Sequence, residues 1–371
     1  MFERFTVGLN NTEISSFFIS MVLRNIALSA IIIFSGALLY DLGASIPLIF
    51  AFFLANHAVD FFLVVPTAWL GSRIGFKHLI VISQVPLIIS VLLLSMIEST
   101  GLWIVWIGAL LGLASSLYWT SHHALLAHAA DEGSRGQEVG LIFIGSRIAA
   151  VIGPLLGGLL IALFGFGFSF LMSALVLLAS GLFLLRTPDP RLSEPLSITH
   201  LTDGVRTKDY LASIGFGSNI GANESVWPLL LYTSIVGTVG LGAIFSGGMF
   251  LSLIAAFFAT ALIEGRERFA LVVSALFTSV SWLVRITLRI PLLFLSEPLY
   301  AVSQPFGTVS FFSKTYEQTH RSAVRMIAVR RLGMLSGRML IIGLPILTGG
   351  LLWPSLALAA LLALLPPLLT L

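Results

Sequence analysis

Residues 69–80 read WLGSRIGFKHLI and lie between two long apolar runs. The stretch places Arg73, Lys77 and His78 around Gly75, in a region that otherwise holds almost no charge. Glycine permits the backbone angles of tight turns, and basic residues collect in the cytoplasmic loops of membrane proteins. The stretch therefore predicts a short basic turn that joins two membrane-spanning helices.

The composition of the whole chain supports this interpretation. Of its 371 residues, 57% are hydrophobic and only 10% are charged, which is too little polar surface to coat a soluble globule. The apolar runs reach the roughly 20 residues that a spanning helix needs, and they lack the period of two of barrel strands. The first run contains Arg24 and is interpreted as a retained anchor rather than a cleaved signal peptide.

Several classes of protein are disfavoured by what the sequence lacks. The absence of cysteine excludes disulfides, thiolate catalysis and cysteine metal sites, and no phosphate-binding GxxxxGK[ST] motif occurs. The net charge of +3 is explained by topology and is no argument for nucleic acid. We therefore expect no enzyme activity, no cofactor and no metal.

The pattern of apolar runs predicts the fold class. We expect an all-α integral membrane protein with twelve transmembrane helices in two pseudo-symmetric six-helix bundles. The polar, proline-containing stretch 186–209 divides the chain into an N-terminal bundle (1–186), a cytoplasmic linker (187–208) and a C-terminal bundle (209–371). The predicted spans are 12–38, 45–68, 78–97, 102–127, 139–163, 166–186, 209–235, 239–263, 269–287, 290–312, 323–347 and 350–371.

The distribution of basic residues predicts the orientation. With both termini in the cytoplasm, thirteen of the twenty Lys and Arg residues fall in inner loops or tails, and only Arg285 and Arg289 fall on the outer side. This asymmetry follows the positive-inside rule. We expect a multi-pass protein of the inner (plasma) membrane that is a monomer in the bilayer and does not bind nucleic acid.

Three weak internal repeats support the two-bundle division. ALLYDLG (37–43) resembles LLLYTSIVG (229–237), the basic turn at 71–78 resembles EGRERF (264–269), and GSRIAAVIG (145–153) resembles VRRLGMLSG (329–337). The offsets are similar in all three pairs, which favours a duplicated six-helix unit.

This layout resembles the major facilitator superfamily of secondary transporters. That family carries a G-x-L-a-D-R-x-G-R-[RK] pattern after its second helix, which Leu70, Arg73, Gly75 and Lys77 match. Ala68, Ser72 and Phe76 depart from the pattern, and the loss of the aspartate implies a weaker latch at this turn. The resemblance assigns a gating role to Arg73, Gly75 and Lys77, with Asp131 or Glu132 as partners for Arg73.

A second family pattern lies in the fifth span. Gly140, Gly153, Pro154 and Gly157 match it, and Ala149 replaces its middle glycine. In the family this motif is associated with proton-coupled antiporters, so the resemblance implies export and a gating role for Gly153, Pro154 and Gly157. Independently, small residues every four positions allow a close approach of another helix, and simple packing is the alternative explanation.

Polar side chains inside apolar spans are the candidate transport residues, because burying them in a bilayer is costly. In the N-terminal half these are Arg24, Asn25, His57 and Asp60, with an expected ion pair between Arg24 and Asp60 that is either structural or functional. Tyr118, Trp119 and His122 follow in the fourth span. Arg147 and Arg331 occupy equivalent repeat positions and would bind an anion if they faced one cavity.

The C-terminal half adds two polar groups. GSNIGANESVWP (217–228) supplies Asn219, Asn223, Glu224 and Trp227 on a helix that its glycines and proline predict to be bendable. Glu297, Tyr300 and Gln304 form a stripe that favours a cavity wall. Carboxylates in such a cavity can exchange protons, so Asp60, Glu224, Glu297 and His122 are the predicted proton-coupling residues.

The leading interpretation is a secondary transporter that moves a small organic solute by alternating access, coupled to protons and favouring export. Two alternatives stay open: a flippase for lipids or amphiphiles, and a membrane sensor that transports nothing. A sealed polar cavity favours the transporter, whereas a lateral apolar slot favours the flippase.

Overall fold

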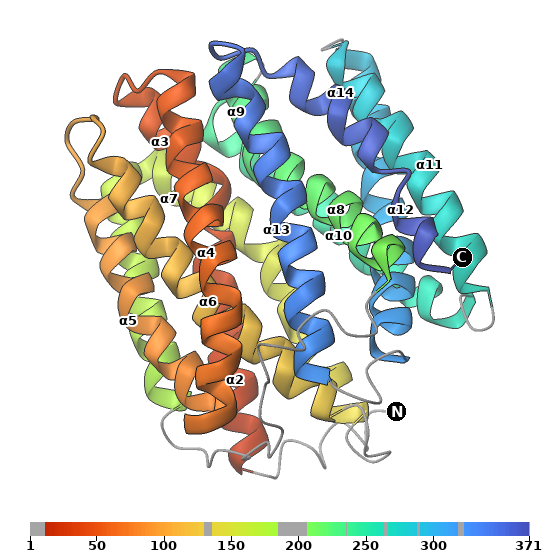
Figure 1. Cartoon of the computed structure of the whole chain (residues 1–371). Helices are drawn as coiled ribbons and strands as arrows, with labels where there is room; N and C mark the ends of the chain where they lie inside the picture. Colours follow the sequence, from red (N-terminus) through yellow and green to blue (C-terminus); the bar gives the residue numbers. More distant parts are fainter. Residues whose placement is uncertain are drawn as a thin grey trace.

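The computed structural model describes residues 12–129, 136–184, 206–234, 236–262, 266–287, 290–317 and 323–370. These ranges are almost entirely helical and contain no β-strand, which confirms the predicted all-α class for the described residues. The helices stand side by side as a bundle, with α2 to α6 on one side and α8 to α14 on the other (Figure 1).

The helices follow the predicted spans closely. The first part of the chain forms α2 (Thr12–Ser29), η1 (Ile32–Phe34), α3 (Ser35–Asp41), α4 (Ile46–Ile74), α5 (Phe76–Ser95), α6 (Ile104–Ala129) and α7 (Gly136–Leu184). The second part forms α8 (Thr207–Gly221), η3 (Ala222–Val226), α9 (Trp227–Ser234), α10 (Thr238–Leu262), α11 (Glu267–Ile286), α12 (Ile290–Glu317), α13 (Ala323–Leu347), α14 (Trp353–Leu362) and η4 (Pro366–Thr370).

Seven segments of the described chain are long and apolar enough to cross a membrane. They are 19–41, 46–74, 76–95, 104–125, 147–183, 238–259 and 267–286. The count of twelve spans stays a prediction. Part of the difference is local chemistry, since α13 carries four arginines, Arg325, Arg330, Arg331 and Arg338, within a mainly apolar helix.

A glycine breaks α7 where two spans were predicted to meet. Gly165 has φ +83°, outside the helical region, so the segment is two helices joined at a kink between the predicted ends at 163 and 166. Glycine tolerates this angle because it has no Cβ.

The small residues of the fifth span pack against α2 as predicted. A methyl group added to Gly153 would overlap the side chain of Ser29 at the end of α2, and one added to Gly157 would overlap the backbone of Ala30, the next residue. Ser29 also donates a hydrogen bond to the Ala149 carbonyl at 3.1 Å. Next to Pro154, the Leu155 amide donates to Ser246 of α10 at 2.9 Å, so α7 bonds to helices on both sides.

Two pairs of helices join the earlier and later parts of the chain: α4 packs on α13, and α7 packs on α10 (Figure 1). At the α3 end, Tyr232 of α9 donates a hydrogen bond to Asp41 at 2.7 Å. These two residues lie in the first pair of sequence repeats, ALLYDLG and LLLYTSIVG. The largest core cluster also crosses this junction, with Phe34 and Phe53 beside Trp227 and Leu229.

The basic turn between α4 and α5 is built as a glycine hinge. Gly75 ends α4 with φ +100°, and Phe76 begins α5 with its ring over Gly71. Ser72 donates to the Trp69 carbonyl at 2.8 Å, and the Arg73 guanidinium lies 4.1 Å from the Trp69 ring. Lys77 is buried rather than exposed in a loop. The expected partners of Arg73, Asp131 and Glu132, lie outside the described residues.

Candidate functional site

A cavity of about 130 Å³, lined by both polar and apolar side chains, lies between α7, η3, α10 and α12. Its wall includes six of the residues that the sequence marked as binding or proton-coupling candidates: Arg147, Asn223, Glu224, Glu297, Tyr300 and Gln304. The stripe on α12 thus lines a cavity through all three of its members. The roles of these residues stay predictions, but one site brings them together.

Glu297 lines the cavity and is held in place by residues that lie outside the cavity lining. Its Oε1 accepts a hydrogen bond from the indole nitrogen of Trp227 and lies 2.9 Å from the guanidinium of Arg285. Arg285 is completely buried, and the rings of Trp227, Trp282 and Tyr300 each lie 4.5 Å from it. Aromatic faces stabilise a cation. The side chain of Glu297 is therefore fixed by an ion pair inside an aromatic cage.

The position of Arg285 on the outer side of the membrane stays a prediction, and the sequence did not mark this residue as part of a site. Arg285 and Trp282 are three residues apart on α11 and share a face that packs into the protein. The spacing of this arginine and this tryptophan was the available signal. The signal was overlooked because Arg285 lies in the last turn of an apolar run.

Glu224 is held more loosely than Glu297. It lies in η3, a π-helical turn from Ala222 to Val226, which agrees with the predicted irregularity of this helix. Its Oε2 lies 3.4 Å from Arg338 of α13, and 39% of its side chain is exposed. π-helical turns occur often at functional sites because they redirect side chains.

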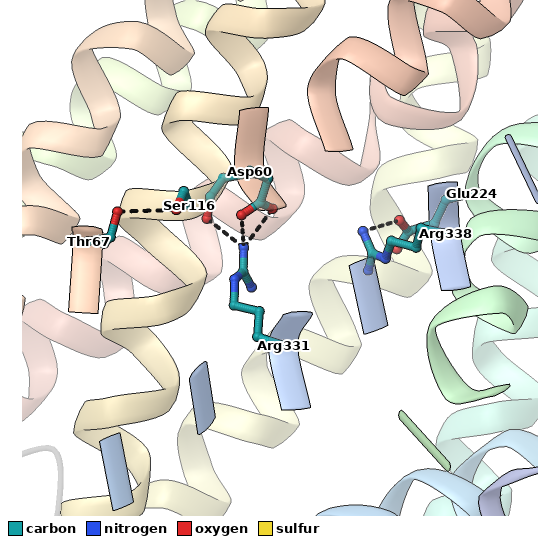
Figure 2. Close-up of polar contacts among 7 residues, drawn as sticks. Asp60, Thr67, Ser116, Glu224, Arg331 and Arg338 are labelled. Carbon is teal, nitrogen blue, oxygen red and sulfur yellow. Dashed lines mark hydrogen bonds and ion pairs between the residues drawn. The ribbon is translucent and has the colours of Figure 1, made fainter. Parts of the chain in front are cut away.

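Asp60 forms a tight ion pair with Arg331 (Figure 2). The Nη2 of Arg331 donates to both carboxylate oxygens at 2.7 Å and to the Ser115 carbonyl at 3.1 Å. Close by, Thr67 and Ser116 are hydrogen-bonded at 3.1 Å. The pair links α4 to α13, and Arg331 does not line the cavity that contains Arg147. The anion site that the two arginines would form by facing one cavity is not found at this cavity and stays a prediction.

The expected ion pair between Arg24 and Asp60 is also wrong. Arg24 of α2 instead donates to Gln84 of α5 at 3.4 Å and lies 3.7 Å from the ring of Tyr118. In the described part of the chain no carboxylate lies within ion-pair distance of it, although its side chain is buried. Gln84 was not singled out from the sequence, because an amide in an apolar run carries no charge to draw attention.

The remaining candidates fall outside the cavity wall. Tyr118, Trp119 and His122 form an aromatic cluster on α6, with His122 stacked on Tyr118 at 5.4 Å. Asn219 accepts a hydrogen bond from Trp282 at 2.7 Å, which makes it a support of the aromatic cage. His57 is buried on α4, whereas Asn25 is half-buried on α2.

Metal chemistry finds no support in the described ranges. They contain no group of three or more His, Asp or Glu side chains placed to hold a metal ion.

Comparisons with known proteins agree on one family. A profile of the Major Facilitator Superfamily matches residues 15–369. Two proteins described as MFS-type transporter ppzB, from Metarhizium majus (strain ARSEF 297) and Metarhizium rileyi (strain RCEF 4871), are each 28% identical over 127 residues, or 34% of this chain. The match spans only 27% and 26% of the length of these curated relatives.

Solved structures share the fold across nearly the whole chain. A POT family transporter in complex with a thioalcohol-conjugated peptide has a TM-score of 0.77 at 12% identity, covering 96% of this chain and 95% of its own. The human organic anion transporter MFSD10 has a TM-score of 0.71 at 16% identity, covering 96% and 98%. At such low identities the similarity concerns the fold alone.

Proposed function

Because this chain belongs to the Major Facilitator Superfamily, we propose that it is a secondary transporter that moves a small organic solute across the membrane. The observation that supports the proposal is the cavity that holds these polar side chains, to which α7 contributes from the first part of the chain and η3, α10 and α12 from the second. Its wall holds charged and amide side chains, which favours a polar solute over a lipid tail.

Alternating access is proposed as the mechanism. The helices up to α7 and those from α8 onward act as two bundles that rock about the cavity, and the α4–α13 and α7–α10 contacts are the surfaces that would separate. The Asp60–Arg331 ion pair crosses the first of these surfaces. It therefore has to break whenever α4 and α13 part.

Protons are the proposed coupling ion, and Glu224 is the best placed of the four candidate residues to exchange them. Its carboxylate lines the cavity, is partly exposed and makes a long contact with Arg338. The other three candidates are less accessible. Asp60 is buried and paired with Arg331, Glu297 is paired with the buried Arg285, and His122 is stacked in an aromatic cluster. Proton exchange needs a group that is accessible from each side of the membrane in turn. Glu224 meets this requirement best of the four.

We infer the direction of transport and the location of the protein from two sequence features. The small-residue and proline motif of α7 favours proton-linked export. The bias of basic residues supports a location in the inner membrane with both termini in the cytoplasm. We propose that it works there as a monomer.

Proteoliposomes with an imposed pH gradient test the proposal. Purified protein is screened with a panel of small organic solutes, and proton flux is followed with an internal pH dye. We expect solute-dependent proton flux in the wild type and its loss in Glu224→Gln. Glu98→Gln, in the exposed loop after α5, is the matched control and should keep the wild-type flux.

If no solute in the panel moves protons, or if Glu224→Gln and Glu98→Gln behave alike, the coupled mechanism through Glu224 is wrong.

A further inference from the structure

We propose that Glu297 is a fixed binding group for a protonated amine of the transported solute, and that Gly248 is the specificity position that keeps this group accessible. The proposal rests on the proposed transport function and adds the chemical class of the solute. It also separates the roles of the two cavity carboxylates, because Glu224 exchanges protons while Glu297 binds the solute.

The two oxygens of Glu297 face different surroundings. Oε1 accepts the Trp227 hydrogen bond and contacts Arg285, so it points into the aromatic cage. Oε2 points toward Gly248 of α10, where a methyl group added to the glycine would lie 3.6 Å from it. Both Glu297 and Gly248 line the cavity. One oxygen is therefore anchored, and the other is presented to the cavity.

The anchor holds the carboxylate in place. A cation and an N–H donor both contact the same oxygen, Oε1. Arg285 cannot leave this position easily, because three aromatic rings surround it and none of its side chain is exposed. A carboxylate held in this way suits the binding of a solute.

A protonated amine is the solute group that this arrangement fits. An ammonium carries only donors, and a charge-assisted N–H···O contact needs an approach of about 2.8 Å to the acceptor. The glycine at 248 leaves the space beside Oε2 that such an approach requires. The nearby Asn223 and Gln304 offer amide oxygens as further acceptors on the same wall.

Binding to purified protein tests this without a gradient. The probes are butylamine, γ-aminobutyrate and butyrate, which are similar in size and differ in charge. We expect the two amines to raise the unfolding temperature and to bind in calorimetry, and butyrate alone to do neither. Glu297→Gln should abolish amine binding.

Because Glu297→Gln also leaves Arg285 buried without its partner, Gly248→Ala is the decisive variant. Its methyl covers Oε2 but leaves the ion pair in place, so the protein should fold normally and bind amines about tenfold more weakly. Gly247→Ala is the matched control, since a methyl there meets no atom within 4 Å. It should bind amines as the wild type does.

Three outcomes would overturn the inference: stabilisation by butyrate only, no stabilisation by either amine, or equal amine affinity in Gly248→Ala and Gly247→Ala. The assay needs no pH gradient, so amine binding without proton-driven transport would refute only the proposed function. Proton-driven transport of butyrate alone would refute only the inference about amines.

Discussion

Arg331 and Arg338 lie seven residues apart on α13, two helical turns along one face, yet their ion pairs differ in every measure (Figure 2). Arg331 reaches Asp60 at 2.7 Å, and the Asp60 side chain is 3% exposed. Arg338 reaches Glu224 at 3.4 Å, and the Glu224 side chain is 39% exposed. The first pair joins α13 to α4, whereas the second joins α13 to η3 in the later part of the chain.

The sequence assigned the same role, proton coupling, to Asp60 and Glu224, but their ion pairs suit different roles. A tight buried pair between α4 and α13 forms only when these helices are in contact. Removing one partner is costly because it leaves a buried charge unpaired. A loose, partly exposed pair can open and close around a proton or a solute at little cost. One arginine face thus carries both a structural contact and an exchangeable one.

Arg331→Met should give the largest effect. It removes the partner of a buried carboxylate, so we expect the free energy of unfolding to fall by about 3–5 kcal/mol. Thermal or denaturant unfolding of purified protein in detergent measures the loss. Arg338→Met is the matched control and should cost about 1 kcal/mol or less, because Glu224 keeps access to water. Equal losses in the two variants would contradict the contrast between the pairs.

Replacing both members of the tight pair should cost less than replacing one. In the double variant Asp60→Leu with Arg331→Met, no charge is left unpaired and apolar side chains fill the space, so most of the lost stability should return. The same unfolding assay applies, with Asp60→Leu alone as the comparison. A double variant less stable than both single variants would contradict this. It would mean that the ion pair stabilises the fold more than apolar side chains of similar size do.

The sequence predicted features that depend on short stretches of chain. The kink at Gly165, the close packing at Gly153 and Gly157, and the irregular turn around Glu224 each follow from a few adjacent residues. The cavity wall on α12 followed from a helical stripe.

The sequence could not predict which distant helices would be neighbours. Asp60 was assigned to Arg24 because their helices are adjacent in the chain, but α4 packs on α13 and brings Arg331 closer. Arg285 was not singled out because its contacts with Trp227, Glu297 and Tyr300 come from other helices. Partner choice is a property of packing, and packing is set by the whole fold.

The smallest effect should come from the contact at the other end of the molecule. Tyr232 donates to Asp41 at 2.7 Å, and like Asp60–Arg331 this contact joins the earlier and later parts of the chain, but it is exposed. Tyr232→Phe removes only the hydroxyl, and water can replace the lost hydrogen bond, so we expect a loss of about 0.5–1 kcal/mol. Tyr40→Phe is the matched control, since Tyr40 holds the equivalent repeat position with 41% of its side chain exposed.

Burial and the charge of the donor differ between these two contacts, whereas the crossing between the two parts of the chain does not. Both contacts involve a carboxylate, both cross the same junction, and their distances are equal. If Tyr232→Phe destabilises the protein as much as Arg331→Met does, then the crossing itself governs stability, and the burial and charge of the Asp60–Arg331 pair do not. A small loss that still exceeds that of Tyr40→Phe would show that the hydroxyl contributes while burial and charge set the size of the effect.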